Sequence, residues 1–255
     1  MSASQALQLV ARACIQEIQA QEPILRRTRS PEALHQIRVA LRRWRTALSV
    51  FGAAGGEDRT RTTLKWLSRE LNEARDLDVF ADAFAARRAG GAGEDLLWET
   101  GHTGLQAPPR ADDGPSARKA AAKALEHRWG KLKRRGRKLM GMDGEARHRL
   151  RIQAKKVRYT TELCGELFGH AKRQARMGKA LKGMQDSLGV LNDLVVGETV
   201  ALKLARRASS LEAAFAAGML IGTRACEEQK PVLKSARKAY LDFAAVDRFW
   251  RGAAG

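Results

Sequence analysis

The stretch that decides the fold reads His35-Gln36-Ile37-Arg38-Val39-Ala40-Leu41-Arg42-Arg43-Trp44-Arg45, in which Lys or Arg follows a histidine at positions +3, +7, +8 and +10. The pattern returns as His148-Arg149-Leu150-Arg151-Ile152-Gln153-Ala154-Lys155-Lys156-Val157-Arg158, a shift of 113 residues (148 − 35). No other histidine of the chain carries it. Two occurrences of so specific a spacing indicate an internal duplication.

A companion pattern follows each of these stretches. Leu64-Lys65-Trp66-Leu67 is matched by Leu181-Lys182-Gly183-Met184, a shift of 117 residues (181 − 64), and each run continues to an Asp-Leu pair. The difference between the two shifts is about one helical turn, which a connection between helices can absorb. Each half is therefore expected to be a helical hairpin built on the same plan.

The whole chain has an all-helical pattern. Ala, Leu, Arg, Lys and Glu dominate, and apolar residues recur three and four positions apart without sustained alternation. Ser30-Pro31 and the segment from Ser209 to Glu212 predict helix starts, and Gly52 and Gly169 predict matching helix ends. The predicted fold class is all-α, a duplication of helical hairpins with pseudo-twofold symmetry.

Glycine and proline divide the chain. Residues 1–255 are predicted to form one domain with a first helical half at 1–88, a Gly/Pro-rich connector at 89–116 and a second helical half at 117–255. Equivalent apolar faces should pack the two His-bearing helices near a pseudo-twofold axis, so that their basic residues border a shared groove.

The repeated basic residues form one stripe on each helix. At about 100° per residue, four side chains of the first repeat fall within about 80° of the helix surface, namely His35, Arg38, Arg42 and Arg45. Arg43 lies at the margin. The apolar side chains occupy a different face, formed by Ile37, Leu41, Trp44, Leu48 and Phe51. The second copy keeps the charge and has fewer large apolar residues.

Cations spaced one helical turn apart repel one another by roughly 0.2–0.5 kcal/mol per pair, and the stripe contains no carboxylate. A solvated helix face or a satisfied core histidine would be the ordinary explanation. Repetition of the stripe with a histidine at the same register favours a binding surface instead. Forked arginine donors and lysine charges suit a phosphate-rich ligand.

Composition limits the partners. A net charge of +19 attracts polyanions, so nucleic acid, anionic membrane and polyphosphate are all candidate ligands. Cys14, Cys164 and Cys226 form no CxxC pair, which favours a reduced, cytoplasmic setting. The segment from Met1 to Gln21 is unlike a signal peptide, and no apolar run approaches membrane-spanning length, so no membrane insertion is expected.

Catalysis, metal binding and nucleic-acid binding are weaker alternatives. Asp76, Asp78 and Asp193 could hold a metal, but helix capping or ion pairing is the commoner role for such residues. No HExxH, P-loop or paired-carboxylate motif is present, so no enzyme activity and no cofactor are expected. Single-stranded nucleic-acid binding, RNA above all, is the alternative, although the stripes lack aromatic residues for base stacking.

These residues resemble the CHAD family, the conserved histidine α-helical domain, whose hallmark is the duplicated His-x-x-Arg-x-x-x-Arg/Lys-Arg/Lys-x-Arg helix. The segments from Arg75 to Val79 and from Leu188 to Asp193 look like the companion motifs of that family, and Phe249-Trp250 looks like its aromatic ending. The resemblance implies two helical bundles around a basic groove that binds inorganic polyphosphate without catalysis. No triphosphate-tunnel enzyme domain, which some members carry, is visible.

By that resemblance the polyphosphate contacts would be His35, Arg38, Arg42, Arg43, Arg45, His148, Arg151, Lys155, Lys156 and Arg158. Lys65, Lys182 and Arg128 are weaker candidates. The expected partner is inorganic polyphosphate, with polyphosphate granules and their proteins as further candidates.

Overall fold

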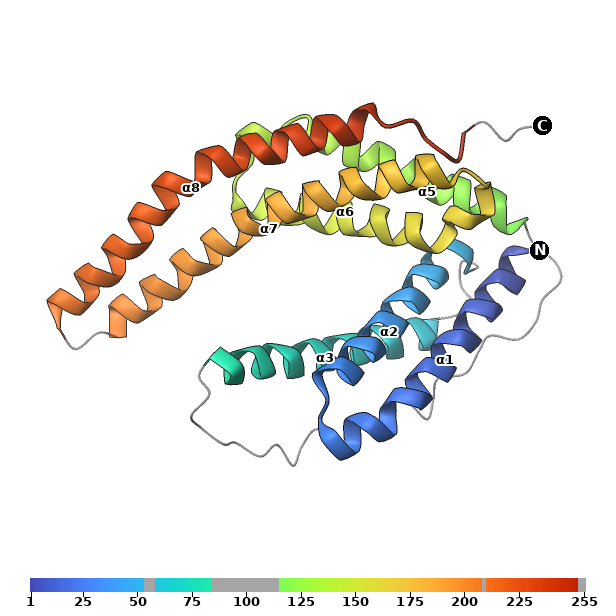
Figure 1. Ribbon diagram of the computed structural model, residues 1–255, viewed down its shortest axis with the longest axis horizontal. Helices are drawn as coiled ribbons and strands as arrows, with labels where there is room; N and C mark the ends of the chain where they lie inside the picture. Colours follow the sequence, from blue (N-terminus) through green and yellow to red (C-terminus); the bar gives the residue numbers. More distant parts are fainter. Residues whose placement is uncertain (53–57, 84–114, 208–209, 252–255) are drawn as a thin grey trace. The chain divides into compact units, whose positions relative to one another are not determined.

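The computed structural model describes residues 1–52, 58–83, 115–207 and 210–251. The helices in chain order are α1 (Ala3–Thr28), α2 (Pro31–Phe51), α3 (Asp58–Ala83), α5 (Ala117–Gly136), η1 (Leu139–Gly141), α6 (Gly144–Cys164), η2 (Gly165–Phe168), α7 (Ala171–Arg207) and α8 (Leu211–Ala245) (Figure 1). In the described ranges the sole extended pairing is an isolated bridge between Ser2 and Ser116. The expected all-α fold is confirmed. None of the described helices is long and apolar enough to cross a membrane.

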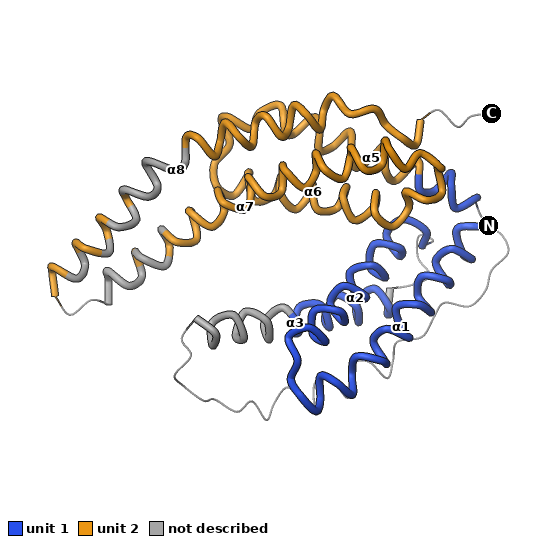
Figure 2. The backbone as a smooth tube through the Cα atoms, in the orientation of Figure 1, with its two compact units in different colours: residues 1–121 blue, residues 122–255 orange. Residues whose placement is uncertain are grey.

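The chain forms two compact units, Met1–Ala121 and Ala122–Gly255 (Figure 2). In unit 1, α2 packs against both α1 and α3. In unit 2, α7 packs against both α6 and α8. The expected Gly/Pro connector falls almost entirely on residues 84–114, which lie outside the described part of the chain.

The two His-bearing helices have the same length and the same boundaries. Each contains 21 residues, and α6 begins and ends 113 positions after α2. Both begin at a side-chain cap: Ser30 accepts a hydrogen bond from the backbone N–H of Ala33, and Asp143 accepts one from Ala146. Each cap satisfies a backbone donor in the first turn of its helix. The start predicted at Ser30-Pro31 is confirmed.

The predicted helix ends were only partly right. The helix α2 stops at Gly52 as expected, whereas α6 stops at Cys164, with Gly165 as the true counterpart of Gly52. After Cys164 the chain tightens into the 3₁₀ helix η2, and it is this element that ends at Gly169, with a left-handed φ of 70°. Gly169 therefore does follow the end of a helix, but that helix is η2, whereas the prediction assigned this end to the His-bearing helix.

The buried positions of α6 repeat those of α2. Each residue that α6 buries lies 113 positions after a buried residue of α2. The side chains at these positions shrink or become polar from α2 to α6, in the pairs Leu34 and Arg147, Leu41 and Ala154, Trp44 and Val157, Leu48 and Thr161, and Phe51 and Cys164. The smaller apolar face expected for the second copy is confirmed.

Aromatic residues from other elements fill the core of unit 2. Phe249 packs edge to face on Phe168 of η2 at 5.6 Å and on Trp250 at 4.9 Å between ring centroids. Trp129 of α5 lies 6.2 Å from Phe243 of α8. These rings bury large apolar areas, so unit 2 depends less on α6 for its core than unit 1 depends on α2.

The starts of α1 and α5 lie side by side within unit 1. Two hydrogen bonds join them, from Ala3 N to Pro115 O at 2.9 Å and from Ala117 N to Met1 O at 3.1 Å. The pair is reciprocal under a shift of 114 residues (117 − 3), and the intervening Ser2 and Ser116 each cap their own helix. This pairing has local twofold symmetry. A twofold relation between the complete halves remains a prediction.

Candidate functional site

The first basic stripe lies on the accessible side of α2. Its histidine, His35, is exposed, as is Arg45, while Arg38 and Arg42 are partly exposed. The opposite face fixes the register of the helix, because Ile37, Leu41 and Trp44 are fully buried. Burial of part of the Arg45 side chain lowers the pKa of its guanidinium, which nevertheless stays charged at neutral pH. The stripe therefore presents its cations toward solvent.

Arg43 lies apart from this stripe. It is exposed on the edge of α2 that faces α1. There its positive charge acts on the thiol of Cys14: burial raises the pKa of that thiol to about 11, and Arg43 opposes the rise. The marginal position expected for Arg43 agrees with this placement.

The second basic stripe runs along the packing seam between α6 and α7. His148 is exposed, and Arg151, Lys155 and Arg158 are partly exposed, while Lys156, the counterpart of Arg43, is exposed beside this row. The two ends of the stripe are held by amide side chains of α7. The ring Nδ1 of His148 lies 2.7 Å from Oδ1 of Asn192, and Nη1 of Arg158 donates to Oε1 of Gln185 at 3.1 Å.

Gly189 of α7 lies at the middle of the seam, beside Arg151. A Cβ at Gly189 would lie 3.4 Å from Nη2 and 3.6 Å from Nε of Arg151. The guanidinium therefore lies close to the backbone of α7 at Gly189. Gln185, Gly189 and Asn192 follow Lys182 at +3, +7 and +10, so all four lie within about 80° on one face of α7.

The seam holds more donors than acceptors. Among the described residues, Nε of Arg151 and Nε2 of Gln185 are buried without a hydrogen-bond partner. Buried polar atoms are ordinarily paired, so these two donors are available to an acceptor that reaches the seam.

One carboxylate closes the stripe at its C-terminal end. Glu162 accepts a hydrogen bond from Nε of Arg158 at 2.8 Å, and the guanidinium of Arg158 also lies 5.6 Å from the ring centroid of Tyr159. The repeat itself contains no carboxylate, and Glu162 extends the same helical row by one turn. Arg158 is thus partly neutralised and fixed in place.

The three weaker candidates lie in different surroundings. Lys65 and Lys182 are exposed, and Lys182 shares the face of α7 that borders the seam. Arg128 instead bonds to the hydroxyl of buried Thr160, and burial lowers its pKa. Burial also raises the pKa of neighbouring Cys164 to about 12. Arg128 therefore joins α5 to α6 inside unit 2.

Among the described residues, no group of three potential metal ligands occurs. Asp193 is exposed on α7. Asp76 and Asp78 belong to α3, but their side chains lie outside the described part.

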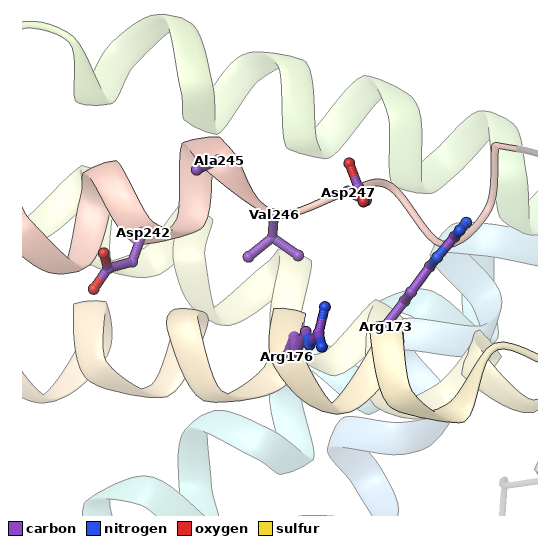
Figure 3. Close-up of a pocket in the computed structure, with 6 residues that line it drawn as sticks. All are labelled: Arg173, Arg176, Asp242, Ala245, Val246 and Asp247. Atoms are coloured by element: carbon purple, nitrogen blue, oxygen red, sulfur yellow. The ribbon is translucent and has the colours of Figure 1, made fainter.

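A separate pocket of about 300 Å³ lies in unit 2 between the start of α7 and the end of α8 (Figure 3). Its lining consists of Arg173, Arg176, Asp242, Ala245, Val246 and Asp247. Two arginines face two aspartates, so the lining has no net charge to select an anion. The duplicated stripes are the stronger candidate for function.

Sequence reasoning missed the neutral residues that position the second stripe. Gln185, Gly189 and Asn192 carry no charge and were not among the predicted contact residues, although Gly189 and Asn192 lie in the segment from Leu188 to Asp193 that resembles a companion motif. Their spacing after Lys182 repeats the +3, +7 and +10 spacing of the basic stripe. That shared register was the available signal.

Comparisons with known proteins agree with this fold. The family model for the CHAD domain matches residues 9–100 and 90–202. The crystal structure of the CHAD domain from the plant Ricinus communis is similar, with a TM-score of 0.64 and 28% sequence identity over 94% of this chain and 92% of that one. A comparison with curated proteins gave no match.

Proposed function

The chain belongs to the CHAD family, and we propose that it binds inorganic polyphosphate through the stripes of α2 and α6. The observation that carries the proposal is the duplicated stripe itself. Two helices of equal length, with side-chain caps at equivalent positions and a buried face at the same positions, present histidine and basic residues in the same register. Between α2 and α6 the buried positions recur but the buried residue types differ. The histidine and the basic residues, by contrast, recur at each position of the stripe.

The partners of the second stripe support an anionic ligand. Asn192 and Gln185 orient His148 and Arg158 through amide oxygens, which accept hydrogen bonds without adding negative charge. The stripe therefore keeps most of its positive charge while its side chains are held. Held cations lose less conformational entropy when a ligand binds, which favours affinity.

The residue types fit phosphate oxygens. Arginine donates two parallel hydrogen bonds to a phosphate, and lysine supplies a compact charge. With Nδ1 of His148 donating to Asn192, its Nε2 is the ring atom left for a ligand. A linear chain of phosphates could contact successive cations, because they recur at about one helical turn.

The proposed activity is binding without turnover. Hydrolysis of a phosphoanhydride would need a metal ion or an activated nucleophile held among the cations. The groups that contact His148, Arg151 and Arg158 include two amides, the backbone at Gly189 and the carboxylate of Glu162. We further propose that this binding places the protein in the cytoplasm at polyphosphate granules.

The proposal is tested by comparing four ligands at one salt concentration, since affinity for phosphate polymers depends steeply on salt. The ligands are long-chain polyphosphate, tripolyphosphate, single-stranded RNA and duplex DNA. We expect long-chain polyphosphate to bind most tightly, because the stripes lack exposed aromatic side chains for base stacking. Equal or tighter binding of single-stranded RNA would overturn the proposal.

A further inference from the structure

The helix α5 carries a second row of cations outside the duplicated stripes. Lys123, His127, Lys131 and Arg134, here named the outer α5 band, are all exposed. At about 100° per residue they lie within about 80° of one another. The residues that α5 buries, among them Leu125, Trp129 and Leu132, lie on the opposite side of the helix. The band therefore faces away from the core of unit 2.

The duplicated fold does not require this band. By the shift of 114 residues that relates α5 to α1, its counterparts are Leu9, Ala13, Glu17 and Ala20. None of them is a cation. The outer α5 band is thus an addition to the second half of the chain.

The one carboxylate of α5 does not neutralise the band. Glu126 is occupied by the C-terminal segment, where Nη1 of Arg248 and Nε1 of Trp250 each donate to it at 2.9 Å and Nη2 of Arg251 donates at 2.7 Å. Burial alone would raise the pKa of Glu126, but the hydrogen bonds from Trp250 and Arg251 and the charges of both arginines lower it overall. The group of Glu126, Arg248 and Arg251 has a net positive charge.

The band is itself without salt-bridge partners among the described residues. A Cβ at Gly130 would lie 3.6 Å from Nη1 of Arg134, so the guanidinium extends back along the helix toward the band. Neighbouring cations three and four residues apart cost roughly 0.2–0.5 kcal/mol per pair when nothing opposes them. A polyanion lying along the helix would remove this repulsion.

We propose that the outer α5 band is a second binding site for a phosphate chain, separate from the stripes of α2 and α6, so that one protein molecule can hold two polyphosphate chains together. The identity of the ligand rests on the proposed function. The row from Lys123 to Arg134 spans about 16 Å of helix, enough for several phosphates. Its cations are spaced along the axis in the way a linear ligand requires.

Polyphosphate fits the band better than RNA does. The aromatic residue nearest in sequence is Trp129, which is buried, and its ring is covered by Lys133 at 4.6 Å and Arg248 at 4.5 Å from the ring centroid. No member of the band is Phe, Tyr or Trp, and its one exposed ring is the small imidazole of His127. Base stacking, which supplies much of the affinity of single-stranded RNA binders, has no large exposed ring here.

The test compares three variants of the full chain with the wild type. The band variant carries Lys123→Gln, Lys131→Gln and Arg134→Gln. The α6 stripe variant carries Arg151→Gln, Lys155→Gln and Arg158→Gln. The control variant carries Arg12→Gln, Arg59→Gln and Lys172→Gln, three exposed cations on separate helix surfaces. All three lose the same formal charge, and circular dichroism verifies that each remains folded.

Calorimetric titration with a short polyphosphate should give one bound chain fewer per molecule in the band variant, with the affinity of the remaining sites changed less than twofold. With long chains, light scattering should report bridging by the wild type and the control, and loss of bridging in the band variant. Should the triple variant unfold, the single substitutions Lys123→Gln and Lys131→Gln should each weaken the same site by several fold.

Unchanged stoichiometry and unchanged bridging in the band variant would overturn the inference while leaving the proposed function intact. Binding of single-stranded RNA but not polyphosphate at the band would overturn it as well. Absence of polyphosphate binding by the wild type, or full binding by the α6 stripe variant, would instead contradict the proposed function.

Discussion

The helices α2 and α6 match in length, capped starts and buried positions, yet they contribute differently to their units. The buried face of α2 carries Trp44 where α6 carries Val157, and Phe51 where α6 carries Cys164. The cations on the opposite side keep both their register and their charge. The difference shows that the basic stripe is the shared feature of the two helices, while the core behind it was free to change.

The aromatic core of unit 2 comes from elements other than α6. Phe168, Phe249 and Trp250 pack together beside α6, and Trp129 packs on Phe243. These residues come from α5, η2, α8 and the C-terminal segment. Consequently α6 can present its stripe on a thinner apolar face without being the main source of stability.

The largest expected contrast is in stability. Trp44→Ala should cost about 3–5 kcal/mol of unfolding free energy, because it leaves a large cavity in the core of unit 1. Val157→Ala, at the equivalent position, should cost about 2 kcal/mol, since a much smaller side chain is lost. Urea denaturation followed by circular dichroism measures both. Equal costs would show that α2 and α6 support their units to the same degree.

A smaller effect is expected where α6 meets α7. Gly189→Ala should weaken polyphosphate binding by about threefold, because the added Cβ would lie in van der Waals contact with the guanidinium of Arg151 and restrict its movement in the seam. Gly178→Ala in the same helix is the matched control, since its Cβ would meet nothing within 4 Å. Both substitutions raise helix propensity by up to about 1 kcal/mol.

Calorimetry measures both the affinity for polyphosphate and the stability of each variant. We expect weaker binding in the Gly189 variant alone and higher stability in the Gly178 variant. Equal affinity of the two variants would mean that the contact between Arg151 and Gly189 does not position the stripe.

A third expected effect is on pH dependence. A bound polyanion favours the protonated, cationic form of a histidine beside it, so affinity should rise as pH falls. One added charge close to a phosphate contributes about 1 kcal/mol in water, a change of roughly fivefold. For His148 the new donor would be Nε2, because Nδ1 faces Asn192.

The variant with His35→Gln and His148→Gln should have a flatter pH profile between pH 5.5 and 7.5, measured by titration with long-chain polyphosphate. A profile as steep as that of the wild type would mean that groups other than these two histidines cause the pH dependence of binding.

Local sequence signals predicted much of the fold. The His-based repeat identified α2 and α6, and Ser30-Pro31 placed the start of α2 correctly because capping depends on neighbouring residues. The end of α6 was misplaced, since Gly165 and Gly169 are both plausible stops and tertiary packing selects between them. The 3₁₀ helix between them has no comparable sequence signal.

Less of the candidate site than of the fold could be predicted from the sequence. The repeat located the cations, but it could not show that Arg128 bonds to Thr160 in the interior or that Glu162 pairs with Arg158. Charge indicates which residues can bind a phosphate, whereas exposure and partners depend on contacts between helices. Neutral Gln185, Gly189 and Asn192 were missed for the same reason.

The central claim is that both stripes bind polyphosphate, and affinity for long-chain polyphosphate tests it most directly. One variant carries Arg38→Gln, Arg42→Gln and Arg45→Gln, a second carries Arg151→Gln, Lys155→Gln and Arg158→Gln, and the control carries Arg12→Gln, Arg59→Gln and Lys172→Gln. A charge-assisted hydrogen bond contributes about 1.5–3 kcal/mol, so each stripe variant should lose more than about tenfold in affinity. The control should change less than about threefold. A stripe variant that binds as tightly as the control would contradict the account.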